Sequence, residues 1–90
     1  MVRGFVLITV EPGREMEAYR GFSKAKDIVE ATPLLGDIDF LLVIEAKEPN
    51  DIAKIVIKQI RTIPGVVSSK TLIEDEFLRH FEDLASDKEW

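Results

Sequence analysis

The side chains best suited to bind a small ligand lie together in one short segment between two apolar runs. In that segment a glycine and two carboxylates meet apolar neighbours: Leu35, Gly36, Asp37, Ile38 and Asp39. Either carboxylate can accept hydrogen bonds from a cationic group. Gly36 lets main-chain atoms approach a ligand closely because it has no side chain. Asp39 follows the turn, so it is expected to tolerate truncation if it serves recognition alone.

Two hydroxyl side chains further along the chain, Ser69 and Thr71, can donate hydrogen bonds to an anionic group. A simpler interpretation applies to all these residues. Gly36 and Asp37 tolerate the backbone angles of a tight turn, and the hydroxyls then decorate an outer strand. The one histidine, His80, has no oriented partner or pocket in the pattern, so it is assigned no function.

The composition narrows the class of protein. The chain has 90 residues, the size of one small domain, and it contains no cysteine, which excludes disulfides, thiolate metal sites and cysteine nucleophiles. No metal or cofactor is expected. The amino terminus shows no cleavage-site pattern, and no apolar run approaches the ~18 residues of a membrane span. We therefore expect a cytoplasmic protein without a membrane partner.

The negative charge is concentrated at the carboxyl end. Residues 1–73 carry ten acidic and ten basic side chains, whereas residues 74–90 carry seven acidic and two basic ones. Binding to nucleic acid needs clustered Lys and Arg side chains that neutralise phosphates. Neither part supplies such a cluster, so no direct contact with nucleic acid is expected.

The apolar pattern in the first half predicts a strand, a helix and a second strand. Residues 5–10 are apolar on both alternating faces, which is typical of a central strand. The next apolar residues recur at helical spacing: Met16, Tyr19, Phe22 and Ala25. Residues 28–35 form a weaker strand, and Pro33 places it at a sheet edge because proline cannot donate to a ladder.

The second half repeats this order. Gly36 and Asp37 predict a hairpin that leads into a strand at residues 40–44. Either Asn50 or Asp51 can cap a helix whose apolar stripe is Ile52, Ile55, Val56, Ile60 and Ile63. Residues 66–73 form a fourth strand, with Val67, Ser69, Thr71 and Ile73 sharing one face.

These elements predict an α+β fold of the ferredoxin-like βαββαβ type. Right-handed crossovers place the first and third strands inside a four-stranded antiparallel sheet, with both helices on one face. The other face of those strands is also apolar, so a second copy is expected to cover it in a face-to-face dimer. We expect this domain to span residues 1–75. An acidic helical tail follows at residues 76–90, with Phe77, Phe81 and Leu84 at helical spacing.

The Gly-Asp-x-Asp segment at 36–39, followed at a matching distance by Ile-Pro-Gly-Val at 63–66, resembles the effector domain of the Lrp/AsnC transcription regulators. That domain is called RAM, for regulation of amino-acid metabolism. The resemblance covers roughly residues 4–73 and includes the stretches 28–31 and 35–43, Asp51, Ser69 and Thr71.

The resemblance implies a stand-alone effector domain, because the chain has no room for the helix-turn-helix of the family. It implies that a small amino acid binds between dimers, beside the hairpin and the fourth strand, and that dimers assemble into tetramers or octameric rings. The implied contacts are Leu35, Gly36, Asp37, Ile38, Asp39, Ser69 and Thr71. It further implies indirect modulation of transcription, through association with full-length regulators. Leu35 replaces a usually polar residue and Ile38 an often aromatic one, and both departures bear on which amino acid binds.

Two other functions remain open at this point. A small dimeric α+β barrel enzyme, of the monooxygenase or isomerase type, has the same fold class. Such an enzyme needs a polar catalytic group in a cavity lined by the sheet, and the central strands offer only Thr9 and Asp39. A purely structural assembly unit without a ligand is the third interpretation.

Overall fold

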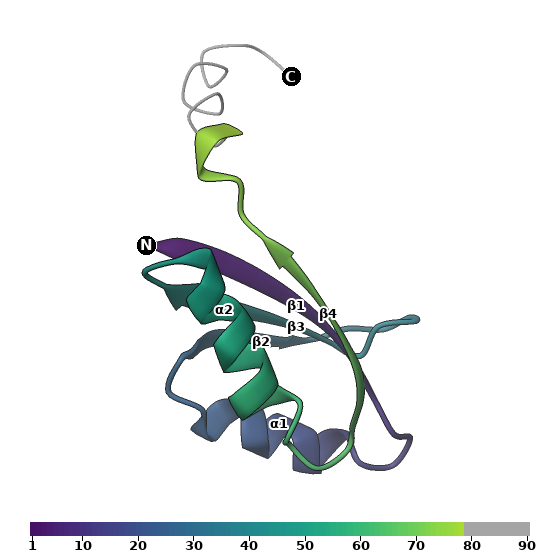
Figure 1. Ribbon diagram of the computed structural model, residues 1–90. Coiled ribbons are helices and arrows are strands. Elements are labelled where there is room, and N and C mark those ends of the chain that lie inside the picture. Colours follow the sequence, from purple (N-terminus) through teal and green to yellow (C-terminus); the bar gives the residue numbers. More distant parts are fainter. Residues whose placement is uncertain (79–90) are drawn as a thin grey trace.

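The computed structural model describes residues 1–78. Its elements follow the predicted order: β1 (Val2–Val10), α1 (Glu15–Lys24), β2 (Ile28–Pro33), β3 (Phe40–Ala46), α2 (Pro49–Ile55), the π-helix η1 (Val56–Ile60) and β4 (Val66–Ile73). The strands form one antiparallel sheet in the order β2-β3-β1-β4. Both helices lie on the same side of this sheet (Figure 1). The predicted ferredoxin-like arrangement is confirmed, with β1 and β3 in the centre.

The core lies between the sheet and the helices. Alternate residues of β1 and β3 point toward the helices and are buried, among them Val6, Ile8 and Leu42. The helices contribute the rest of the same buried cluster: Ala18, Phe22, Ile52, Val56 and Ile60. The stripe predicted for the second helix is confirmed, with Ile55 and Ile63 packed at its margin.

Close packing between α2 and β1 depends on Gly4. A methyl group built at Gly4 would lie 2.6 Å from the Cγ2 atom of Ile52, which is fully buried. The absence of a side chain therefore lets the helix rest directly on the strand.

Gly4→Ala is expected to destabilise the fold by about 1–3 kcal/mol, because the added methyl overpacks a closed core. Urea unfolding monitored by circular dichroism measures this change. On an Ile52→Ala background the same substitution is expected to cost less, since the clashing methyl is gone and the new one fills part of the cavity. Equal costs on both backgrounds would show that the two residues are not coupled.

The first helix differs from its prediction. Ala18 and Phe22 are its buried residues, whereas Met16 is 65% and Tyr19 is 37% exposed. Tyr19 instead contacts the ring of Phe40 at the edge of the core, with ring centroids 6.0 Å apart. The predicted stripe was therefore rotated too far, because it favoured large apolar residues over the small Ala18.

The second helix begins earlier than predicted. Pro49 occupies its first turn and Glu48 precedes it, and no side chain caps the helix, so the predicted cap at Asn50 or Asp51 was wrong. Proline suits this position because its fixed backbone angle is already helical and the missing donor has no partner there. The helix then widens into η1, where the amide of Arg61 donates to the carbonyl of Val56 at 2.9 Å.

A β-bulge changes the faces of β4. Ile8 pairs with Ser69 and Val10 pairs with Val66, so the register shifts around Val67. A bulge inserts one extra residue and reverses the alternation beyond it. Val66 therefore shares the helix side with Ser69, and the prediction that grouped Val67 with Ser69 was wrong.

The face of the sheet that the helices leave uncovered is apolar at its centre. We call it the open face; its apolar residues are Phe5, Leu7, Leu41, Val43 and Leu72, and Lys70 lies beside them, opposite Leu7. Arg3 lies toward one end of it, over the ring of Phe5 at 5.5 Å and 3.2 Å from the carboxylate of Glu74. This is the apolar second face that the sequence predicted for the central strands.

The chain leaves the sheet after β4. Residues 76–78 form a first helical turn, and the carboxylate of Asp75 accepts from the amides of Phe77 and Leu78, each at 3.0 Å. The tail predicted for residues 76–90 lies outside the described residues beyond Leu78, and with it His80, Phe81, Leu84 and Trp90.

Candidate functional site

The predicted ligand segment forms an exposed loop. Residues 34–39 join β2 to β3, and the amide of Leu34 donates to the carbonyl of Asp39 at 2.8 Å. Gly36 has a backbone φ of +136°, which strongly favours glycine. The side chain of Leu35 is fully exposed. The expected tight hairpin with a strand reaching Leu35 is thus a six-residue loop, because β2 ends at Pro33.

The two carboxylates of this loop have different surroundings. The amide of Asp39 donates to the carbonyl of Ile8, and its carboxylate accepts from the amide of Val10, both at 2.8 Å. Asp39 therefore holds the end of β1, so its role is not recognition alone. Asp37 is exposed and forms no hydrogen bond or ion pair within residues 1–78. It is the carboxylate that is free to meet a cation.

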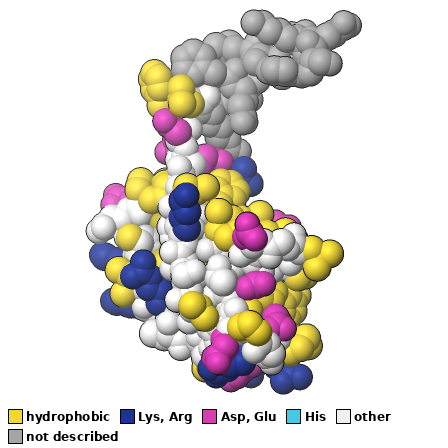
Figure 2. Space-filling view, turned by 90° about the vertical axis from the view of Figure 1, so that its right-hand side faces the viewer, with side chains coloured by type: hydrophobic (Ala, Val, Ile, Leu, Met, Phe, Trp, Pro, Cys, Tyr) yellow, Lys and Arg dark blue, Asp and Glu magenta, His cyan; other side chains and the backbone are white. Residues whose placement is uncertain are grey.

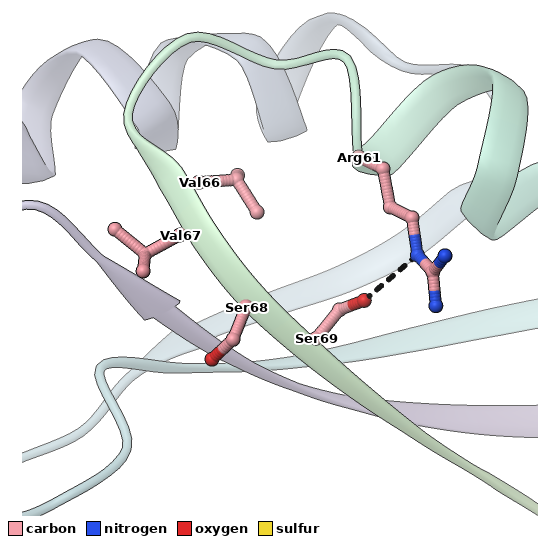
Figure 3. Close-up of a pocket in the computed structure, with 5 residues that line it drawn as sticks. All are labelled: Arg61, Val66, Val67, Ser68 and Ser69. Carbon is pink, nitrogen blue, oxygen red and sulfur yellow. Dashed lines mark hydrogen bonds between the residues drawn. The ribbon is translucent and has the colours of Figure 1, made fainter.

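The two predicted hydroxyls line separate hollows beside the helix. Ser69 accepts from Nε of Arg61 at 3.3 Å. Both residues belong to an open hollow of about 350 Å³ beside β4, which is lined by Arg61, Val66, Val67, Ser68 and Ser69. Figure 3 shows these five side chains. Thr71 lines a neighbouring hollow of about 240 Å³, to which Arg61 also belongs.

The loop and the hydroxyls do not come together within one chain. Ile8 pairs with Phe40 on one side and with Ser69 on the other, so β1 lies between the two groups. Strands are spaced about 4.8 Å apart, which separates β3 from β4 by roughly 10 Å. The ammonium and carboxylate of an amino acid are attached to the same carbon atom. Within residues 1–78 of one chain, Asp37 and Ser69 therefore lie on opposite sides of β1 and do not line a common hollow.

Arg61 is the site residue that the sequence prediction missed. Arg14 lies between Glu11 and Glu17, whose carboxylates are 3.3 and 2.9 Å from its guanidinium. The hydrogen bonds with Glu17 raise the pKa of Arg14, and those with Arg14 lower the pKa of Glu17. Arg61 has no carboxylate partner within residues 1–78. A cation between Ile60 and Ile63, the last two residues of the apolar stripe of the second helix, was the available signal.

Two kinds of site can be assessed over residues 1–78. No group of three His, Cys, Asp or Glu side chains there is arranged to hold a metal ion. No helix of this part of the chain is long and apolar enough to cross a membrane.

Comparison with known proteins identifies the domain. The family model of the Lrp/AsnC ligand-binding domain matches residues 3–74. The chain belongs to the Lrp/AsnC family. Because the match is to the ligand-binding domain of that family, the chain is an effector-binding regulatory module. No protein with a curated description matches this Lrp/AsnC domain.

Solved structures share its fold. A hypothetical protein of Pyrococcus horikoshii is 25% identical with a TM-score of 0.76, and the match covers 89% of this chain and 98% of that one. AsnC of E. coli is 20% identical with a TM-score of 0.75, covering 81% of this Lrp/AsnC chain and 50% of AsnC. A Neisseria meningitidis transcriptional regulator, solved as a complex with L-Met, is 16% identical with a TM-score of 0.73. The match covers 89% of this chain and 58% of that regulator. The chain thus spans about half the length of the last two proteins.

Proposed function

We propose that this Lrp/AsnC domain binds a free amino acid at sites formed between two copies, and that binding changes how dimers associate. The family match and the L-Met complex of the Neisseria relative support an amino acid as the effector. The domain then modulates transcription indirectly, through tetramers, octameric rings or mixed assemblies with full-length regulators. In this proposal residues 1–75 form the effector domain and residues 76–90 its acidic tail.

The observation that carries the proposal is the separation of the two polar groups. The loop at 34–39 offers an acceptor in Asp37 and an exposed apolar side chain in Leu35. The hollow beside β4 offers the donors Arg61 and Ser69. Each group supplies one half of an amino-acid site, and each is open to solvent. A loop from one copy that reaches the hollow of another completes the site.

The surface suits such contacts. On the face shown in Figure 2, several Lys and Arg side chains lie together on the left and several Asp and Glu side chains lie on the right, while other charges of both signs and hydrophobic side chains are distributed over the rest of the face. Opposite charges that lie apart on one molecule attract when two copies meet. The apolar open face is the surface through which two sheets pair, since a single copy leaves it uncovered.

A screen of the twenty amino acids by thermal shift tests the proposal. A ligand that binds only the folded state at about 100 times its dissociation constant adds about 2.7 kcal/mol of stability. For a domain of this size that raises Tm by roughly 10–20 °C. L-Met is the first candidate. If none of the twenty amino acids raises Tm, the domain is a structural assembly unit or has an unrelated ligand.

Mixing two blocked variants tests whether the site is shared. Asp37→Lys repels the ammonium of the amino acid, and Ser69→Glu repels its carboxylate. Neither variant alone is expected to bind. When the two are co-expressed in equal amounts, about a quarter of the shared sites carry both native residues and regain binding. If each site lies within one chain, no site regains both residues and calorimetry shows no binding.

A further inference from the structure

Arg61 is held in place by one backbone hydrogen bond and one side-chain hydrogen bond. Its amide closes the wide turn of η1 on the carbonyl of Val56, which fixes where the side chain leaves the helix. The side chain then extends across the gap to β4 and donates from Nε to the hydroxyl of Ser69 (Figure 3). The two terminal nitrogens of the guanidinium form no hydrogen bond within residues 1–78 and point away from the other residues that line the hollow (Figure 3). A guanidinium of this kind can bind a carboxylate with two parallel hydrogen bonds.

The hydroxyl of Ser69 can act together with Arg61. A serine hydroxyl has one hydrogen to donate, and Ser69 uses an oxygen lone pair to accept from Arg61. Its own hydrogen is therefore available for a second acceptor on the same side. The bulge at Val67 contributes to this arrangement, because Val66 and Ser69 are three residues apart and would otherwise lie on opposite faces.

The hollow combines a positive charge with apolar surface. Val66 points toward Arg61 and Val67 points to the other side of the strand, and both line the hollow (Figure 3). Its volume of about 350 Å³ falls at the lower end of the range for small-molecule sites. These properties fit a carboxylate that carries a short aliphatic chain.

We propose that Arg61 binds the carboxylate of the effector, assisted by the hydroxyl of Ser69, and that Val66 contacts an apolar effector side chain. This inference rests on the proposed amino-acid function and specifies its chemistry. It assigns the effector to the amino acids with apolar side chains. Arg61 is the charged contact that distinguishes an amino acid from its amide.

Calorimetry with L-Met, L-Leu and the corresponding amides tests this assignment. The wild type is expected to bind at least one of the two acids more tightly than its amide, by roughly tenfold to a hundredfold, because the amide removes the charge-assisted hydrogen bonds. Arg61→Gln should weaken binding of the acid by a similar factor and leave the amide unchanged, so that the preference disappears. Arg61→Lys should keep part of the preference for the acid, since lysine carries the positive charge but lacks the planar guanidinium.

Arg20→Gln is the matched control, because Arg20 is exposed on α1 and its loss changes the net charge equally. It should leave both affinities unchanged. A wild type that binds acid and amide equally, or an Arg61→Gln variant that weakens both alike, overturns the role of Arg61 while leaving the amino-acid function intact. If inorganic phosphate binds and loses affinity in Arg61→Gln while no amino acid binds, the hollow is an anion site and the proposed function fails. If neither an amino acid nor phosphate binds, both proposals are wrong.

Discussion

Leu41→Lys is expected to give a folded monomer in place of the proposed face-to-face dimer. Leu41 lies at the centre of the open face, opposite Leu7 on the neighbouring strand and pointing away from the helices. In a face-to-face dimer the lysine would be buried against a second apolar sheet without a partner, and an unpaired buried charge costs several kcal/mol. In the monomer it is solvated. Light scattering at micromolar concentration measures the mass, and circular dichroism checks the fold.

Leu42→Lys is the informative comparison, because it makes the same change one residue later. Leu42 is fully buried on the helix side of β3. Its replacement places the charge inside the core, where the cost rivals the total stability of about 5–15 kcal/mol, so the variant is expected to be unfolded. If Leu41→Lys remains a stable dimer, the open face is not the dimer interface.

Truncating each of the two loop carboxylates in turn gives the second large effect, because one truncation should lower stability and the other should weaken ligand binding. Asp39→Ala is expected to destabilise the ligand-free protein by about 1–3 kcal/mol, because the amide of Val10 loses a charged acceptor. Asp37→Ala should leave stability within about 0.5 kcal/mol, since its side chain is exposed. It should instead weaken amino-acid binding, by roughly a hundredfold, because the bound ammonium loses its acceptor.

Thermal unfolding without ligand, followed by calorimetry with L-Met, separates these effects. Asp39→Asn serves as the control for Asp39→Ala, because its side-chain oxygen still accepts from Val10 and should recover most of the lost stability. Two outcomes would contradict the assignment. Asp39→Ala could melt like the wild type, or Asp37→Ala could bind the amino acid as tightly as the wild type does.

The sequence was sufficient for the order of the elements and for the arrangement of the sheet. A strand that is apolar on both faces needs cover on both sides, which the centre of a sheet provides best. On this basis β1 and β3 were correctly predicted to be central. Pro33 marked an edge for a different reason, since it cannot donate to a ladder. The other predictions depended on the average polarity of whole segments, which single residues change little.

The details of the site depended on local geometry that polarity does not report. The bulge at Val67 reverses a face without any unusual residue type, and the wide turn of η1 directs Arg61 toward Ser69 through one backbone hydrogen bond. The carboxylate of Asp39 was expected to be free, but it satisfies an amide at the end of β1. Such hydrogen bonds become visible only when strands distant in sequence lie side by side.

The position of β1 also affects how the domain is made. In this domain β1 is synthesised before the other strands, yet one of its two edges pairs with β4, which is synthesised last. Gly4, for example, pairs with Ile73. Pairing between segments so far apart forms late, because closing the long loop costs entropy before any contact repays it. Until Val66–Ile73 has left the ribosome, the apolar central strand keeps an unpaired edge. Nascent chains at this stage present a template for aggregation, so the time spent translating the last third of the domain is when a chaperone matters most.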